Sequence, residues 1–296
     1  MRPFSLRYPA AFKAVVLVGV IVPFLATVLA VYLLWERAVS WSDLALLGVM
    51  YSLIKLGEEV GIHRMLSHRS FRPHPVVKFV LLVLGSMAME GPVLEWAAVH
   101  IKHHARADRE GDPHSPLEGF FHAHIGWFFK DRMADRNVYC RHLLKDPIIV
   151  LVNRTYGLWV LLSLVLPFLI GGWTGLLWAG LVRIFLVHHV TFSTNSVCHI
   201  FGKREFETPD ESRNQWIAAL LSFGQGWHNN HHAFPRSAFA AVHWWQLDLS
   251  GYLIWILERL GLVRDVYRFP PDVQARRFLR SENVALGTSD LLKEQS

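Results

Sequence analysis

Charged residues and cysteines are scarce in this chain of 296 residues. Only 18% of the residues are charged, against about a quarter in a typical soluble domain, whereas 52% are hydrophobic. The two cysteines, Cys140 and Cys198, cannot build a disulfide framework or a thiolate metal site. The composition therefore excludes a disordered chain and argues against an ordinary soluble enzyme. The residues in excess are histidine, with 17 copies, and tryptophan, with 12.

Long apolar runs predict an all-α integral membrane fold with four transmembrane helices in two hairpins. The first run, Ala14–Trp35, has 22 residues without a charge, which is enough to cross about 30 Å of hydrocarbon. It is longer than the apolar region of a signal peptide, which has about 7 to 15 residues. The run at 76–88 is short for a crossing and is interpreted as non-crossing. The expected spans are about 14–35, 42–62, 155–171 and 173–195, the last two joined by Gly171 and Gly172.

The distribution of basic residues predicts the orientation. Of the 30 Lys and Arg residues, 3 lie in 1–13, 13 in 64–154 and 11 in 203–296. By the positive-inside rule, both termini and the polar segments are cytoplasmic. The net charge of +6 then reflects topology and not nucleic-acid binding. We expect one domain over 1–268, with a cytoplasmic helical cap at 63–154 and 196–268, followed by a polar tail at 269–296.

Nine histidines form three tight clusters and one single position. They are His63 and His68 in HRMLSH, His100, His103 and His104 in HIKHH, His199 in NSVCH, and His228, His231 and His232 in HNNHH. An i, i+3, i+4 spacing places imidazoles on one helix face. His63 and His68 are about 140° apart on an ideal helix, so we expect the segment to bend or end between them. Nine imidazoles exceed the needs of one ion and predict two metals with four or five ligands each.

The ligand type narrows the choice of metal. Imidazole suits Zn, Cu, Fe and Ni, and the lack of clustered thiolates disfavours an iron–sulfur centre. The H-E-x-x-H signature of zinc proteases is absent from the sequence. A histidine-rich site beside a membrane suggests redox chemistry on an apolar substrate, with iron activating O2. The other histidines are interpreted as hydrogen-bonded structural residues: His74, His114, His122, His124, His142, His188, His189 and His243.

Six segments together resemble the membrane-bound fatty-acid desaturases of the stearoyl, delta-9 type. They are GIHRMLSHRSF, EWAAVHIKHH followed by GDPHSPLEGFFHAHIGW, TFSTNSVCH, GWHNNHHAFPRSA and WWQLDL. The resemblance covers about residues 10 to 268. It implies a cytoplasmic cap over four transmembrane helices and a di-iron centre that uses O2 to make a cis double bond in a saturated acyl chain. It also implies that the nine clustered histidines are the ligands and that Asn195 approaches one iron through a water.

The same resemblance implies a bent tunnel for the acyl chain. Trp96 and Thr191 match residues that hold the bend near the irons. Glu90 stands where acyl-CoA desaturases often have Gln, and Tyr51 lies near the point where relatives close the far end.

Lys55 lies in the same apolar helix as Tyr51 and needs a partner there. Glu58 at i+3 or Glu59 at i+4 is expected to pair with it, as a salt bridge near the end of the helix. Relatives usually have small or neutral residues in this segment, so the sequence leaves the chain length of the substrate open.

The resemblance also bears on the acyl carrier and the electron donor. Acyl-CoA members often carry Arg-Asp where this chain has Ala98 and Val99, which favours the bacterial and cyanobacterial branch acting on acyl-lipids or other thioesters, and hence a bacterial inner membrane. No HPGG heme motif is present, so a separate donor such as ferredoxin or cytochrome b5 is expected. Four basic residues are candidates for its docking surface: Lys203, Arg204, Arg213 and Arg236.

Two other functions fit part of the pattern. A membrane di-iron hydroxylase of an alkyl, sterol or carotenoid substrate would share the histidine clusters, although GDPHSP and WWQLDL favour desaturation. A metal transporter would place its ligands along a crossing path. Here the histidines lie at helix ends or in loops on one predicted face, which disfavours transport.

Overall fold

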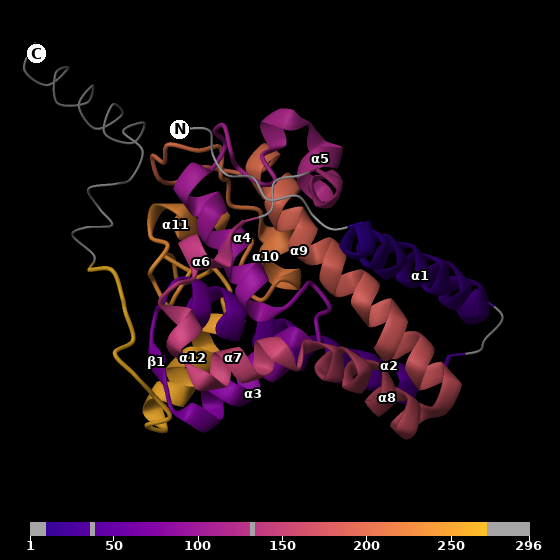
Figure 1. Ribbon diagram of the computed structural model, residues 1–296. Coiled ribbons are helices and arrows are strands. Elements are labelled where there is room, and N and C mark those ends of the chain that lie inside the picture. The colour runs from indigo at the N-terminus through magenta and orange to yellow at the C-terminus, as the bar shows by residue number, and fades with distance from the viewer. Residues whose placement is uncertain (1–9, 36–38, 131–133, 271–296) are drawn as a thin grey trace, which may run out of the picture.

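The computed structural model describes residues 10–35, 39–130 and 134–270, which are largely helical (Figure 1). The predicted tail beyond residue 270 lies outside this range. The helices are α1 Ala10–Trp35, α2 Trp41–Leu56, η1 Gly57–Ser67, α3 Pro75–Ser86, α4 Val93–Arg106, η2 Pro116–Glu118, α5 Phe120–His124, η3 Gly126–Phe129, α6 Arg136–Tyr139, η4 Leu143–Lys145, α7 Pro147–Arg154, α8 Tyr156–Gly175, η5 Leu176–Val182, α9 Arg183–Ile200, α10 Trp216–Leu221, α11 His228–Ala233 and α12 Leu249–Arg259. Two short antiparallel strands, β1 Arg72–Pro73 and β2 Val263–Arg264, pair Arg72 with Arg264.

Two helical stretches in the described residues are long and apolar enough to cross a membrane, Ala10–Leu34 and Tyr156–Ile200. The second turns at Gly172, whose φ of 60° and ψ of −146° suit glycine and no other residue type. The turn falls where Gly171 and Gly172 were predicted to join two helices. Large apolar side chains on these stretches are exposed, among them Val15 at 63% and Leu169 at 71%. The helical class is thus confirmed, and the outer surface of the long helices is apolar.

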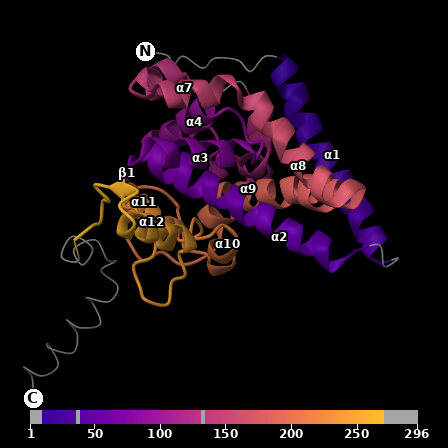
Figure 2. The same ribbon diagram turned by 90° about the horizontal axis from the view of Figure 1, so that it is seen from below.

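The long helices extend to one side of the molecule, and the short helices that carry most of the histidines gather on the other (Figures 1 and 2). Helix α1 meets the rest of the protein through a narrow stripe of small residues, since its buried positions are Gly19, Pro23, Ala26 and Ala30. Their spacing of three and four residues places them on one face of the helix. Ala30 packs with Trp178 and Val182 of η5, and near the start of the helix Phe12 and Val16 pack against the cluster that contains Trp127 and Phe128.

Helix α2 and the π-helix η1 divide the stretch that was predicted as one span over 42–62. η1 crosses α3 at very close range because glycines stand at the crossing. A Cβ on Gly57 would lie 2.4 Å from the Cβ of Leu84, and one on Gly61 would lie 2.8 Å from the carbonyl oxygen of Leu81. Backbone therefore packs on backbone here, and η1, which carries the first histidine cluster, is held firmly in place.

Candidate metal centre and adjoining cavity

Five histidines from different segments converge in a first group. They are His63 and His68 from η1 and its C-terminal cap, His100 and His104 from α4, and His231 from α11, and their ring nitrogens lie within 4.8 Å of one another. The winding of η1 explains how His63 and His68 meet, since the amide of His68 bonds to the carbonyl of His63 at 3.2 Å, an i to i+5 bond. In such a turn, residues five apart lie nearly above one another. The helix ends after Ser67, as the spacing required, but it is wound wider and not bent.

Four further histidines form a second group beside the first. They are His103, His199, His228 and His232, again with nitrogens within 4.8 Å of one another. The two groups adjoin, because the rings of His104 and His232 have centroids 4.5 Å apart. Helix α4 contributes to both groups. The structure thus brings all nine predicted histidines together, divided five and four.

Buried carboxylates accept hydrogen bonds from four of these imidazoles, on the side of the ring that faces away from the centre of the group. The Nδ1 atoms of His63, His103, His199 and His232 donate to Glu59 at 2.9 Å, Asp112 at 3.0 Å, Asp108 at 2.9 Å and Asp210 at 3.0 Å, respectively. Each of these bonds fixes a proton on Nδ1 and leaves the Nε2 lone pair aimed at the centre of its group, as in many metal sites. Sequence reasoning missed the three aspartates and offered Glu59 only as a partner for Lys55. The signal available was the closeness of Asp108 and Asp112 to the second histidine cluster.

Within each group, ring nitrogens face one another at distances that favour a bound cation. Nε2 atoms meet at 3.1 Å between His63 and His231 and at 3.0 Å between His199 and His228, and the Nε2 of His103 is buried without a hydrogen-bond partner. Facing lone pairs repel unless a positive charge lies between them. Burial, reinforced by neighbouring imidazoles, holds the pKa of His68, His100, His104, His228, His231 and His232 well below the ordinary value. Neutral imidazole is the metal-binding form, so the donor set fits two transition-metal ions.

Most of the remaining histidines have ordinary structural contacts. His124 meets His189 at 3.0 Å, the Nε2 of His188 donates to the carbonyl of Ala88 at 3.0 Å, and His243 pairs with Glu205 at 3.1 Å.

His114 departs from the structural interpretation given to it. Its ring stacks on His103 with centroids 4.3 Å apart, and its Nδ1 is buried without a partner. Together with Asp112 and His103 it makes a third group of potential ligand atoms within 4.8 Å of one another.

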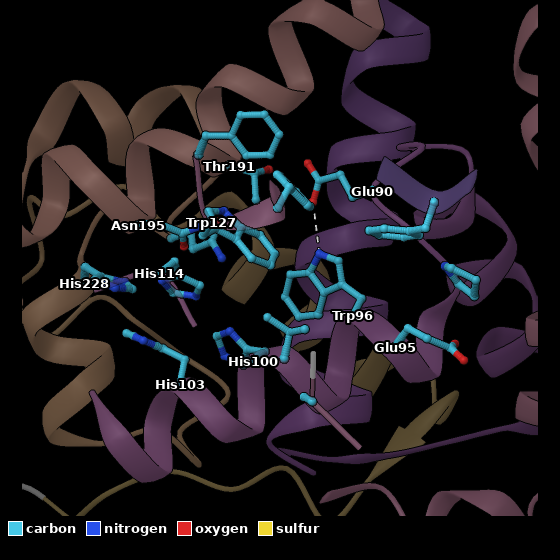
Figure 3. A pocket seen from close by; sticks show the side chains of 18 residues that line it. Glu90, Glu95, Trp96, His100, His103, His114, Trp127, Thr191, Asn195 and His228 are labelled. Atoms are coloured by element: carbon cyan, nitrogen blue, oxygen red, sulfur yellow. Dashed lines mark hydrogen bonds between the residues drawn. The ribbon is translucent and has the colours of Figure 1, made fainter. Parts of the chain in front are cut away.

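A cavity of about 280 Å³ adjoins the histidine groups (Figure 3). Three of the four residues predicted to shape a tunnel line it: Glu90, Trp96 and Thr191. The indole of Trp96 donates to Glu90 at 3.0 Å and stacks on His100 with centroids 5.0 Å apart. Burial, with the nearby Glu58, raises the pKa of Glu90 to about 8, so this carboxyl is largely protonated at neutral pH. Asn195 also lines the cavity.

A second cavity of about 400 Å³ adjoins the first and is lined by residues of α1, α8 and α9. The two cavities share Glu90 and Phe192 among their lining residues, and the walls of the second are almost entirely apolar. Tyr51 lines neither cavity; its hydroxyl donates to the carbonyl of Leu221 at 2.6 Å. Its assignment to a tunnel stays a prediction.

Lys55 has the nearer of its two predicted partners. Its Nζ lies 2.9 Å from Glu58 Oε2 and 2.9 Å from the hydroxyl of Thr191, and both charged side chains are fully buried. Glu59 instead accepts from His63 and, at 3.1 Å, from Arg64. The two adjacent acids thus have separate partners.

The fold and the site define a class: a helical protein with a long apolar surface and two adjoining histidine groups that could hold metal ions beside an apolar cavity. A family model described as "Fatty acid desaturase" matches residues 40–254, and the chain belongs to this family. It is therefore an oxidoreductase, an acyl desaturase by class, as the motifs predicted.

The names of similar proteins indicate that these relatives act on different acyl groups. The chain is 40% identical over 267 residues to "Hex-5-enoyl-[acyl-carrier protein] acetylenase" from Moorena producens, covering 83% of each chain. It is 37% identical over 237 residues to "sn-1 stearoyl-lipid 9-desaturase" from Synechocystis sp., covering 79% of this chain and 74% of the relative. It is 36% identical over 242 residues to "Delta-9 acyl-lipid desaturase 1" from Arabidopsis thaliana, covering 80% and 79%.

Proposed function

We infer that this chain is an O2-dependent desaturase that uses two histidine-bound irons to place a cis double bond in an acyl chain. The observation that carries this function is the convergence of nine imidazoles in two adjoining groups at the wall of an apolar cavity. When bound, a pair of irons supplies the redox chemistry with O2 that the removal of hydrogen from an unactivated methylene requires.

The residues around the irons have separate tasks in this proposal. The ligands are His63, His68, His100, His103, His104, His199, His228, His231 and His232. Asn195, which lines the cavity, would hold one iron through a water. Trp96, held by Glu90 and stacked on His100, forms a rigid wall that fixes the acyl chain beside the histidines. The aromatic lining from Trp127, Phe128 and Phe192 excludes water from the reacting carbons.

The topology proposed for the chain has four spans, at 14–35, 42–62, 155–171 and 173–195. The exposed apolar surfaces of α1 and α8 support it, and so does the meeting of all nine histidines, which requires their segments to end on one side. The domain is 1–268, the cap and termini are cytoplasmic, and the membrane is a bacterial inner membrane. Electrons come from a separate donor such as ferredoxin or cytochrome b5.

Position and carrier are proposed from the resemblance and from the relatives. Two of the relatives named above are 9-desaturases of lipids, and one acts on a chain bound to acyl-carrier protein. We take the ninth bond from the carboxyl end as the reacting position and an acyl-lipid or acyl thioester as the substrate. The absence of Arg-Asp at Ala98 and Val99 speaks against CoA as the carrier.

The test is expression of the full chain in a bacterial host that lacks its own desaturase. We expect unsaturated acyl groups that are absent without the chain and absent without O2, located by mass spectrometry of derivatised double bonds. An alcohol in place of the double bond would assign the chain to hydroxylation. Metal flux in vesicles with no modified lipid would favour transport.

Replacement of a carboxylate behind a histidine should weaken the metal site. We expect Asp112→Asn to lower iron affinity about 10- to 100-fold, because His103 loses the charged partner of its Nδ1. The measurement is iron retained by the purified protein against a graded series of chelator concentrations. Asp146→Asn is the matched control, since Asp146 pairs with Lys78 and is not among the potential ligands. Equal retention by both variants would contradict the assignment.

A further inference from the structure

The fully buried ion pair of Lys55 and Glu58 stands directly behind one wall of the main cavity. Thr191 belongs to that wall, and its hydroxyl accepts from Lys55 Nζ at 2.9 Å and donates to Glu58 Oε1 at 2.9 Å. Neither charged residue lines either of the two cavities. The cavity therefore ends at Thr191, and the ion pair fills the space behind it.

The order of residues along α9 shows what lies past this wall. His199, Asn195 and Thr191 follow one another at steps of four residues, and therefore share one helix face. The next position on that face, Val187, is fully buried in a core cluster with Ile54 and Ala179. Only one turn of helix separates the cavity-lining Asn195 from the blocked position at Thr191.

Helix α2 and η1 lie behind this wall. Along them, Glu59 precedes His63 by four residues and Lys55 precedes Glu59 by four, and both are fully buried. A flexible apolar side chain at position 55 could yield to a methylene. A buried lysine paired with a glutamate cannot, because moving either one leaves an uncompensated charge in a dry interior.

We propose that the Lys55–Glu58 ion pair closes the acyl site just beyond the reacting carbons, so that only a short methyl-terminal segment fits past the new double bond. The inference rests on the proposed desaturase function and names its substrate class: medium-chain acyl groups just long enough for the ninth bond to lie near the methyl end. The second cavity, between α1 and α8, holds the carrier-proximal part of the chain, because its apolar walls open toward the exposed surface of those helices.

The wild-type chain tests this directly. A host without its own desaturase expresses the full chain and receives even-numbered fatty acids from 6 to 18 carbons, and double bonds are located by mass spectrometry. One extra methylene in a closed apolar pocket changes discrimination by about 10- to 200-fold. We therefore expect conversion to fall at least about tenfold for each two carbons beyond the longest good substrate, with every product unsaturated close to its methyl end.

Paired variants test the cause. Lys55→Ala with Glu58→Ala removes both charges and opens the space, and should raise conversion of the 16- and 18-carbon chains, relative to the best short chain, at least about tenfold. Lys55→Arg with Glu58→Asp keeps a buried ion pair at the same place and should keep the wild-type profile. Lys78→Ala with Asp146→Ala removes a different ion pair, between α3 and the start of α7, and should also leave the profile unchanged.

The outcomes separate this inference from the function it rests on. No unsaturated product at any chain length would overturn the desaturase proposal. Mid-chain unsaturation of 16- or 18-carbon substrates by the wild type would overturn the inference and leave desaturation intact, since the methyl end would then lie in the second cavity. If the double alanine variant fails to accumulate, the wild-type profile alone decides.

Discussion

We expect His103→Ala to abolish desaturation, with turnover reduced at least about a thousandfold. His103 belongs to the group of four, and its Nε2 is buried without any protein partner. Losing one of four ligands removes a direct bond to the metal, so the effect exceeds the about 10- to 100-fold loss typical of an outer partner. The measurements are product yield and iron per chain in the purified protein, which should fall to about half.

The matched control is His74→Ala. His74 is exposed, and its ring nitrogen only accepts from the amide of Val76 at 3.3 Å. Iron content and product yield should equal those of the wild type. If His103→Ala retained both iron and turnover, the division of the nine histidines into two metal sites would be wrong.

Asp248→Ala is expected to lower the free energy of unfolding by about 3–5 kcal/mol, the cost of breaking a buried ion pair. Asp248 lies in the WWQLDL segment and meets both terminal nitrogens of the buried Arg64 at 2.9 Å. It also caps α12 by accepting from the amide of Gly251 at 2.9 Å. Arg64 in turn binds Glu59, the partner of His63, so the pair ties the C-terminal helices to the first histidine group.

Thermal unfolding in detergent, followed by tryptophan fluorescence, measures this loss. Arg268→Ala is the control, because Arg268 pairs with Glu258 on the exposed surface of α12, where an ion pair contributes about 0–1 kcal/mol. If Asp248→Ala unfolded at the wild-type temperature, the ion pair with Arg64 would not be what stabilises the contact between the C-terminal helices and the first histidine group.

The histidines could be found from the sequence because their spacing is a local property. The sequence also predicted four or five ligands for each metal, but which histidine joins which group could not be predicted, since it depends on the wide turn of η1. Under ordinary winding, His63 and His68 diverge by about 140°, and the sequence contains no mark of π-helical winding. Within the wide-wound segment, Gly57 and Gly61 lie in close contact with α3.

The aspartates that accept hydrogen bonds from the histidines could not be predicted from sequence patterns. Asp108, Asp112 and Asp210 lie in loops, where no periodicity predicts which way a side chain points. Lys55 illustrates the opposite case. It lies on a helix, so a partner at i+3 or i+4 was foreseeable, and the i+3 partner Glu58 is the one found.

The contrast between α1 and η1 has a consequence for how the enzyme would respond to its lipid surroundings. The backbones of η1 and α3 are in direct contact at Gly57 and Gly61, whereas α1 packs mainly through small buried residues, with Phe12 and Val16 in contact with the rest of the protein near its start. Changes in bilayer thickness or fluidity would thus act on the position of α1 and on how readily a hydrocarbon tail is captured. The catalytic geometry, anchored through glycine contacts, would be insulated from them.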